Sequence, residues 1–403
     1  MTIYDHAVIG GGVIGLTLAW QLSQSGRRVV VLERGEMGRE ASWAGAGILP
    51  PGPPLQETNS TNTSSAKTNS TKIAAVKTSS SKTGRLPDAT VDHPYDQLRA
   101  ISSIRHRQWA EQLKEETGID NGYRICGGVY FARRRGESAA LRGWRSQLED
   151  EGITCSELSR DDVATSEPAV AVDDVRYALL LPDEAQMRNP WHLRALEEAG
   201  RRNNVEFRTS CEVQNILRDS GRITGLETAQ GKVVAENYCF TSGAWTYPLL
   251  ASITTSLAIV PIRGQMILFQ TDRPLINRIL NEGSRYLVPR QDGYLLAGSS
   301  EEEAGYDKST TSDILTQLRE FAFSWLPELR EGREVRSWAG LRPGSFDGFP
   351  YLDRLPAVDN GFVAAGHFRS GLYLSPATAE NMAHWMIYGE PIISLEPFGL
   401  LRR

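Results

Sequence analysis

The stretch GLRPGSFDG, residues 340–348, places one permanently charged side chain, Arg342, among small and turn-forming residues. An arginine in such a setting is usually solvated, so the simplest interpretation is a surface loop. A guanidinium is also the side chain that holds a carboxylate through two parallel hydrogen bonds. Taken alone, the stretch favours the solvated loop, and only neighbouring motifs could make Arg342 a carboxylate-binding residue.

A second stretch has glycines at the spacing of a dinucleotide-binding turn. Gly10, Gly12 and Gly15 follow the apolar run Ala7–Ile9 and precede residues with helical spacing. Glycines there permit a tight turn and let backbone amides approach a pyrophosphate at the helix N-terminus. Glu33 ends the next apolar run, at the position where an acid accepts hydrogen bonds from a ribose. A glycine-rich turn with an incidental acid is the alternative, and the order of the elements favours the dinucleotide.

The same order predicts the fold class. A strand, a helix and a second buried strand form the start of a parallel, doubly wound sheet, because a crossover helix lets two parallel strands pair. At 403 residues the chain is too long for one core, so we expect an α/β protein with two domains. Small residues continue over Met37–Leu49, where the backbone could lie against a large planar ring system.

Later segments are predicted from their apolar patterns and turn residues. The expected segments are a helix over 93–118, a strand over 259–270 that is interrupted at Arg263-Gly264, a hairpin over 285–298, a loop-rich region over 338–355, a strand over 362–365 and a closing helix near 376–388. Ser375 is a possible N-cap of that last helix, with Pro376 in its first turn.

The composition excludes several classes of protein. A formal net charge of -5 gives no general attraction for nucleic acid, no apolar run has the length of a membrane span, and a small-molecule substrate is the default. The four cysteines have no CxxC pair, which argues against a structural zinc site and a disulfide scaffold. We expect free thiols, no metal and a cytoplasmic location.

The amino-acid composition of residues 50–90 differs from that of a globular domain. Proline comes first, then serine, threonine, asparagine and lysine without any aromatic residue, and four lysines recur every five residues (Lys67, Lys72, Lys77 and Lys82). Such a composition cannot offset the entropy of ordering, so we predict a disordered surface insertion. The alternative is a basic arm for an anionic partner, which only the charge supports.

Several motifs together resemble one known family. They are GGGVIG, the pair Glu33-Arg34, ASWAGAGIL, SGAW, AGLRPGSFDGFPYL and AGHFRSGLYLSPAT. In this order they look like the FAD-dependent amine oxidases of the D-amino-acid oxidase type, and within that family they are most similar to the glycine oxidases of the thiamine pathway. The resemblance covers most of the chain outside the insertion.

The resemblance implies a fold and a division of the chain. It implies a Rossmann-type, glutathione-reductase-like FAD-binding domain that is interleaved with a substrate domain on a largely antiparallel sheet. The expected FAD-binding segments are 1–49, 151–240 and 336–403, the insertion is 50–90, and the substrate-domain segments are 91–150 and 241–335.

The resemblance also places the cofactor. It implies noncovalent FAD, since related enzymes with covalent flavin use a cysteine in the C-terminal part and the last cysteine here is Cys239. The positions that match the pyrophosphate turn are Gly10, Gly12, Val13, Ile14 and Gly15, those at the ribose are Glu33 and Arg34, and those on the phosphate side are Ala41 and Ser42. Those along the flavin are Ala46, Gly47 and Ile48, and the position at the adenine is Val213. The flavin-wrapping loop matches His367, Phe368, Arg369, Ser370, Gly371, Leu372 and Tyr373.

For the substrate, the resemblance implies that Arg342 grips a carboxylate and that the hydroxyl of Tyr286 assists it. Arg369 lies in the flavin loop and could touch both ligands. No acid–base residue is assigned, because a neutral amine can deliver a hydride to the flavin without one. His367 could suggest a base, but its place in the flavin-wrapping loop favours a backbone or packing role.

The implied activity is oxidative deamination of glycine or another small amine or D-amino acid by oxygen, with a link to thiazole formation in thiamine biosynthesis. Two alternatives stay open. One is a D-amino-acid or imino-acid dehydrogenase that passes electrons to a quinone or carrier, and the other is an FAD-binding interaction protein whose lysine repeat recruits a partner. The resemblance also suggests a homo-oligomer.

Overall fold

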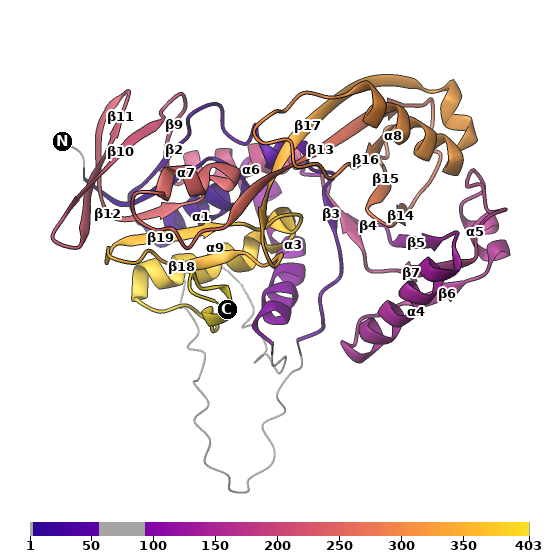
Figure 1. Cartoon of the computed structure of the whole chain (residues 1–403), viewed down its shortest axis with the longest axis horizontal. Coiled ribbons are helices and arrows are strands. Elements are labelled where there is room, and N and C mark those ends of the chain that lie inside the picture. The colour runs from indigo at the N-terminus through magenta and orange to yellow at the C-terminus, as the bar shows by residue number, and fades with distance from the viewer. Residues whose placement is uncertain (1–2, 56–92, 403) are drawn as a thin grey trace, which may run out of the picture.

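The computed structural model of the chain describes residues 3–55 and 93–402. These residues form two large sheets and one three-stranded sheet, with helices packed on both large sheets (Figure 1). Apart from its first residues, the predicted insertion lies outside the described residues, so its predicted disorder stays a prediction.

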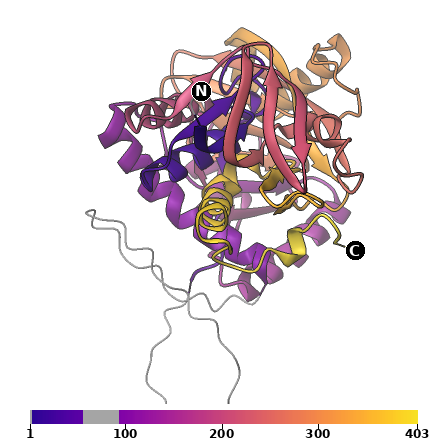
Figure 2. The ribbon, with the colours of Figure 1, turned by 90° about the vertical axis from the view of Figure 1, so that its left-hand side faces the viewer.

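The first sheet is parallel at its centre. Its parallel strands lie in the order β9-β2-β1-β12-β19, and their bounds are β9 (Glu206–Arg208), β2 (Val29–Leu32), β1 (Ile3–Ile9), β12 (Gly231–Phe240) and β19 (Gly361–Ala365). Three antiparallel strands extend this sheet, namely β10 (Val213–Asp219), β11 (Arg222–Thr228) and β18 (Tyr351–Arg354). β11 pairs with β12, β10 pairs with β11, and β18 pairs with β19. Figure 2 shows the molecule with β10, β11 and β12 toward the viewer.

Both faces of this sheet are buried, which is why its central strands are continuously apolar. Val8, Val29 and Val31 face a core shared by four helices, while Ile9 and Val30 face the opposite core. The four helices are α1 (Val13–Gln24), α3 (Pro94–Thr117), α6 (Asn189–Arg202) and α9 (Gly371–Tyr388). The sheet thereby brings the turn before α1 to the carboxyl end of β1, where open α/β sheets bind their ligands.

The second sheet is antiparallel except for one pair of strands. Its order is β17-β13-β16-β15-β14-β5-β7-β6, with β14 and β5 parallel. The bounds are β17 (Arg333–Ser345), β13 (Ile259–Gln270), β16 (Tyr294–Gly298), β15 (Arg285–Pro289), β14 (Ile279–Glu282), β5 (Gly128–Ala132), β7 (Tyr177–Leu181) and β6 (Ser156–Leu158). The two sheets together confirm the predicted α/β class, with a parallel sheet and a largely antiparallel one.

The remaining helices and 3-10 turns are distributed over both large sheets. They are α8 (Ser312–Trp325), α4 (Arg135–Asp150), α5 (Arg160–Ser166), α2 (Ala41–Ala44), α7 (Thr246–Leu250), and the 3-10 turns η1 (Gly243–Trp245), η2 (Pro327–Glu331) and η3 (Glu396–Phe398). The three-stranded sheet consists of β3 (Ile48–Leu49), β8 (Ala185–Gln186) and β4 (Arg124–Ile125). In Figure 1 it lies between the two large sheets.

The loop expected at residues 340–348 is wrong for Gly340–Ser345, which belong to strand β17, and only residues 346–348 form a turn. β17 pairs with β13 along its whole length, and Pro343 lies opposite Pro261. β17 is the edge strand of its sheet and has a neighbour on one side only. A proline, which has no backbone N–H to donate, is therefore tolerated there. The glycines of the stretch allow close packing: a Cβ atom on Gly340 would lie 2.5 Å from the Cβ of Ala44 in α2.

Two other details of the predicted elements are also wrong. β13 is continuous through Arg263 and Gly264. Helix α9 begins at Gly371, and Pro376 lies inside it rather than in its first turn. The proline cannot donate to the carbonyl oxygen of Leu372, and the hydroxyl of Ser375 donates to that oxygen instead (2.9 Å). Ser375 is therefore not a cap.

The sheets divide the chain differently from the expected segments. Strands β6 and β7, from the segment 151–240, lie in the second sheet, as does most of β17 from the segment 336–403. Helix α3, from the segment 91–150, packs on α1, α6 and α9 beside the first sheet. We therefore propose that α3 belongs to the FAD-binding domain and that β6, β7 and β17 belong to the substrate domain.

Among the described residues, no helix combines the length and the apolar character that a bilayer crossing requires.

Gly15 is a point where the fold depends on the absence of a side chain. A Cβ atom there would overlap the carbonyl oxygen of Gly10 and lie 2.6 Å from the hydroxyl of Thr241. We expect Gly15→Ala to push α1 away from β1 and to lower both the melting temperature and the FAD content of the purified protein. Gly143→Ala is the control, because Gly143 lies in α4 with open space around it, so alanine should stabilise that helix slightly. Equal melting temperatures for the two variants would contradict this packing role.

Candidate functional site

One large cavity, of about 690 Å³, is lined by residues of both large sheets. Every residue predicted to bind the cofactor or the substrate borders it, with the exception of Gly15. Gly15 instead packs α1 against the turn, as described above. Residues that are up to 363 positions apart in the sequence, Gly10 and Tyr373, are thus brought to one site by the fold, although their individual roles stay predictions.

The glycine turn forms one end of the cavity. Gly10 has a φ of +116°, and a Cβ atom there would lie 2.7 Å from the carbonyl oxygen of Thr241, so only glycine fits. Gly12 is the N-cap of α1 and has no side chain to cap the helix. Among the described residues only Ser42 Oγ reaches a first-turn amide, that of Val13 (2.9 Å). The free amides of this N-terminus suit a pyrophosphate.

Glu33 lies beside this turn, at the end of β2. Its two carboxylate oxygens accept hydrogen bonds from the amides of Gly11 (2.8 Å) and Gly35 (2.9 Å). These bonds fix the carboxylate at the cavity wall while further lone pairs stay open, as a ribose-binding acid requires. Val213, the first residue of β10, borders the cavity farther along.

Arg34 is placed differently from a simple ribose ligand. Its guanidinium lies 3.8 Å from the ring centre of Trp245 and forms an ion pair with Glu40 (3.3 Å). Glu40 also pairs with Lys308, and Trp245 stacks on Tyr306. Side chains from both sheets therefore meet at this end of the cavity.

The segment predicted to lie along the flavin has a tightly fixed backbone. Gly47 has a φ of +76°, and a Cβ atom there would overlap the carbonyl oxygen of Met187. The buried guanidinium of Arg290 donates to the carbonyl oxygen of Ala46 (2.8 Å) and to the side chain of Gln186. Burial lowers the pKa of Arg290 to about 10. The chain thus fits FAD over the whole cavity, from the acid at Glu33 to this segment.

One face of the second sheet contributes Tyr130, Asn281, Tyr286 and Arg342 to the cavity lining. Residues that pair across successive strands point to the same face, and the paired series Trp338, Met266, Gly298, Tyr286, Asn281 and Tyr130 runs from β17 to β5. Arg342 lies four residues after Trp338 on β17 and therefore shares this face. The substrate-binding candidates Arg342 and Tyr286 thus belong to one wall.

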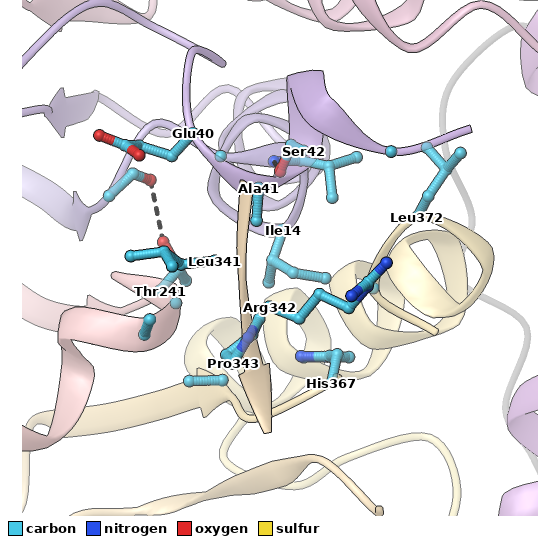
Figure 3. Close-up of a pocket in the computed structure, with 18 of the residues that line it drawn as sticks. Ile14, Glu40, Ala41, Ser42, Thr241, Leu341, Arg342, Pro343, His367 and Leu372 are labelled. Atoms are coloured by element: carbon cyan, nitrogen blue, oxygen red, sulfur yellow. Dashed lines mark hydrogen bonds between the residues drawn. The ribbon is translucent and has the colours of Figure 1, made fainter. Parts of the chain in front are cut away.

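Arg342 has no partner of opposite charge among the described residues. Its guanidinium donates to the Ser299 hydroxyl (2.6 Å) and to the Ser300 carbonyl oxygen (3.1 Å), which are both neutral. It lies directly over Gly264, where a Cβ atom would overlap it. In Figure 3 the side chain extends into the cavity toward the side on which Leu372 lies. The arrangement leaves guanidinium N–H groups and a full positive charge for a ligand.

An ion cluster around the buried Arg263 holds the loop that carries the acceptors of Arg342. Arg263 is only 6% exposed and pairs with Glu302 (2.8 Å) and Asp307 (2.7 Å). Glu302 also accepts a hydrogen bond from the Ser300 hydroxyl (2.5 Å). At the expected strand break, Arg263 anchors this loop through its ion pairs, and Gly264 leaves room for the side chain of Arg342.

The two other candidates for substrate binding, Tyr286 and Arg369, differ in how strongly protein groups already bind them. The hydroxyl of Tyr286 has only a weak acceptor, the sulfur of Met266 at 3.4 Å. Arg369 is exposed and forms an ion pair with Glu301 (2.6 Å). Because Glu301 already neutralises Arg369, Arg342 is the better carboxylate ligand of the two.

His367 is unsuited to act as a base. Its ring is buried, and Nε2 shares a hydrogen bond with the Thr378 hydroxyl (3.1 Å). Burial lowers its pKa to about 3, so the ring stays neutral. No group of three or more metal-ligating side chains occurs among the residues that the structure describes.

The sequence reasoning missed one polar cluster at the cavity wall. Glu184 is fully buried, and its carboxylate accepts hydrogen bonds from the Tyr130 hydroxyl (2.5 Å) and the Asn281 amide (3.3 Å). Tyr130 and Asn281 border the cavity. Burial raises the pKa of Glu184 to about 7. Only strand register brings these residues together, so no local sequence signal could have found them.

A parallel sheet with a glycine turn and a terminal acid, joined to an antiparallel sheet across one long cavity, defines a flavin-dependent oxidoreductase. The family model described as "FAD dependent oxidoreductase" matches residues 5–385. The chain therefore belongs to this family, and its cofactor is FAD.

Several known proteins are similar to this chain over almost its whole length. The chain is 32% identical to a protein of Pseudomonas putida named glycine oxidase, over 97% of this chain and 96% of that one. The crystal structure of glycine oxidase from Geobacillus kaustophilus superposes with a TM-score of 0.86 at 29% identity and covers both chains fully. A protein of Synechocystis named bifunctional protein ThiO/ThiG is 29% identical over 94% of this chain and 51% of its own length.

The raised pKa of Glu184 has a consequence for stability. The folded protein binds this proton more tightly than an unfolded chain, whose carboxyl has the ordinary pKa near 4.5. The protonated Glu184 thus makes its full contribution to the free energy of unfolding below pH 4.5. This contribution is lost as the pH rises through 7, and the loss amounts to roughly 3 kcal/mol at most.

We expect the melting temperature of the wild type to fall, relative to that of Glu184→Gln, between pH 5 and pH 8. Thermal unfolding of both proteins at three pH values measures this difference. Glu328→Gln is the control, because its exposed ion pair with Arg273 should change little. A constant difference between wild type and Glu184→Gln across this range would show that the carboxyl does not titrate there.

Proposed function

We propose that the protein oxidises glycine or another small amine or D-amino acid, with oxygen as the electron acceptor. The products would be the 2-oxo acid, ammonia and hydrogen peroxide. One observation carries the proposal: in a cavity built for FAD, the guanidinium of Arg342 has no anion among the described residues. A substrate carboxylate supplies the missing charge.

FAD, when bound, would supply a two-electron acceptor for the hydride on the carbon beside the amine; oxygen would reoxidise it to give hydrogen peroxide, and water would hydrolyse the resulting imine to the 2-oxo acid and ammonia. The chain's own residues bind and orient the substrate. Arg342 receives the carboxylate through its free N–H groups, and the Tyr286 hydroxyl can exchange the Met266 sulfur for a carboxylate oxygen, which is a stronger acceptor. Two such contacts fix the direction in which the amine carbon points.

No side chain needs to act as a base in this reaction. A neutral amine reacts directly, and the best-placed histidine, His367, is buried and already shares its hydrogen bond with Thr378. The role of the protein is then mainly to orient the substrate and to exclude water.

Other features of the proposal rest on smaller observations. FAD would be held without a covalent bond: Cys211 is the one cysteine that borders the cavity, and it lies next to Val213 at the proposed adenine end. All four cysteines are free thiols, in keeping with a cytoplasmic location. The likeness to a ThiO/ThiG protein supports a link to thiamine biosynthesis. A homo-oligomer is proposed from the family resemblance alone.

Anaerobic reduction tests the activity. Glycine should bleach the flavin of the purified holoenzyme, and admitted oxygen should restore the colour and release hydrogen peroxide. Parallel trials with sarcosine, D-alanine and D-proline would rank the substrates. Reduction by an amine followed by very slow reoxidation would instead favour a dehydrogenase that uses a quinone or carrier.

Arg342→Leu should keep FAD but bind substrate carboxylates at least tenfold more weakly, because charge-assisted hydrogen bonds contribute about 1.5–3 kcal/mol. The half-saturating glycine concentration in anaerobic reduction measures this change.

The matched control is Arg336→Leu, which removes an arginine from the same strand but outside the cavity. Arg369→Leu should have an effect between the two, since Glu301 already pairs with Arg369. An unchanged half-saturating concentration in Arg342→Leu would refute the carboxylate role.

A further inference from the structure

Arg342 and Glu184 both belong to one wall of this cavity, and neither has a partner of opposite charge among the described residues. Arg342 is the cation discussed above. Glu184 is the acid, which becomes an anion when it loses its proton: it contacts the cavity only through Tyr130 and Asn281, and it forms no ion pair. A buried charge without a counter-charge is costly unless a ligand provides one.

The hydrogen bonds of Glu184 determine what the cavity wall offers. The Tyr130 hydroxyl donates its one hydrogen to Glu184, and the Asn281 amide donates one of its two N–H groups, so most of the donors of this pair are turned inward. The phenolic oxygen of Tyr130 and the amide oxygen of Asn281 remain as acceptors. This part of the wall therefore suits a ligand group that donates hydrogen bonds.

The surrounding charges do not neutralise Glu184. Arg369 acts on Tyr130 electrostatically, but Glu301 pairs with it at 2.6 Å. Burial raises the pKa of the Cys126 thiol and that of the Tyr130 hydroxyl, so both groups stay neutral near pH 7. An ionised Glu184 thus leaves this end of the cavity negative.

The spacing of the strands separates the two charges. The guanidinium of Arg342 lies over Gly264 on β13 and bonds to Ser299, the residue after β16, whereas Asn281 lies on β14. Two strand spacings separate β16 from β14, a distance of about 10 Å. The carboxylate and the amine of glycine are less than about 4 Å apart. A substrate that reaches both charges must therefore be longer than glycine.

We propose that the acceptor site formed by Tyr130, Asn281 and Glu184 binds a second, cationic group of the substrate, beyond the amine that reacts. The substrate class is then an amino acid with a carboxylate at one end and an ammonium group at the other. Glu184 acts as a positioning residue that supplies the charge, while Tyr130 and Asn281 make the contact. This inference rests on the proposed function, because it assumes that Arg342 holds the carboxylate.

Two achiral glycine derivatives of equal size test the inference. N-(2-aminoethyl)glycine carries a terminal ammonium about 6 Å from its carboxylate carbon, and N-propylglycine has a methyl group at that position. Their dissociation constants follow from the change in the flavin spectrum of the holoenzyme, and their half-saturating concentrations follow from anaerobic reduction. Glycine serves as the reference in each protein.

In the wild type we expect the ammonium compound to bind roughly tenfold more tightly than N-propylglycine, as for a charge-assisted hydrogen bond. In Glu184→Gln the ratio should fall toward one, while the value for glycine stays within about twofold. Tyr130→Phe keeps the ring that packs on Trp144 and should also lose the preference, so it gives the same answer if Glu184→Gln folds poorly.

Equal binding of the two compounds by the wild type would overturn the inference, and so would a preference that persists in both variants. These outcomes differ from a failure of the proposed function. If none of glycine, sarcosine, D-alanine, D-proline and the two glycine derivatives reduces the wild-type flavin, the proposed oxidation fails, whereas the ratio of dissociation constants still tests the acceptor site.

Discussion

The site depends on one constraint: a guanidinium, that of Arg342, must be held at a partly buried wall without a carboxylate beside it. A neighbouring acid would neutralise the charge and, in the proposed function, would compete with the substrate carboxylate. The structure instead provides two neutral oxygens, from Ser299 and Ser300, and the open surface of Gly264. Arg263 keeps the competing acids, Glu302 and Asp307, in a separate cluster. The loop after β16 is therefore as much a part of the site as Arg342 itself.

The two sheets form different parts of the cavity because their strand geometries differ. Parallel strands gather their carboxyl ends at one edge, which places the glycine turn, Glu33 and Val213 along a single groove for a long cofactor. An antiparallel sheet instead offers a broad face on which alternate residues of each strand point the same way. That face sets Arg342 and Tyr286 opposite the cofactor groove. Their separation is fixed by backbone hydrogen bonds, which hold a substrate more precisely than mobile loops could.

The sequence predicts those parts of the site that depend on local patterns. Gly10, Gly12 and Glu33 are recognisable because a turn, a helix N-terminus and a strand end follow one another within a short span, and the α/β class follows from the same order. The resemblance to a known family adds Arg342 and Tyr286. Strand pairing is what the sequence does not reveal: small residues and prolines read as a loop at residues 340–348, yet an edge strand accepts both. Glu184 was missed for the same reason, because its partners lie on strands β5 and β14.

Buried charges at this cavity differ in where their hydrogen bonds point. Arg290, which lies behind the cavity wall, also has no carboxylate partner among the described residues, but its guanidinium bonds to Gln186 and to the backbone of Ala46, so the protein itself satisfies it. Arg342 and the pair that solvates Glu184 instead keep hydrogen-bonding capacity directed at the cavity. A protein selected for stability alone would replace such groups with neutral ones, since unpaired buried charges reduce stability. Opposite charges retained on one wall are therefore best explained by a ligand that carries both signs.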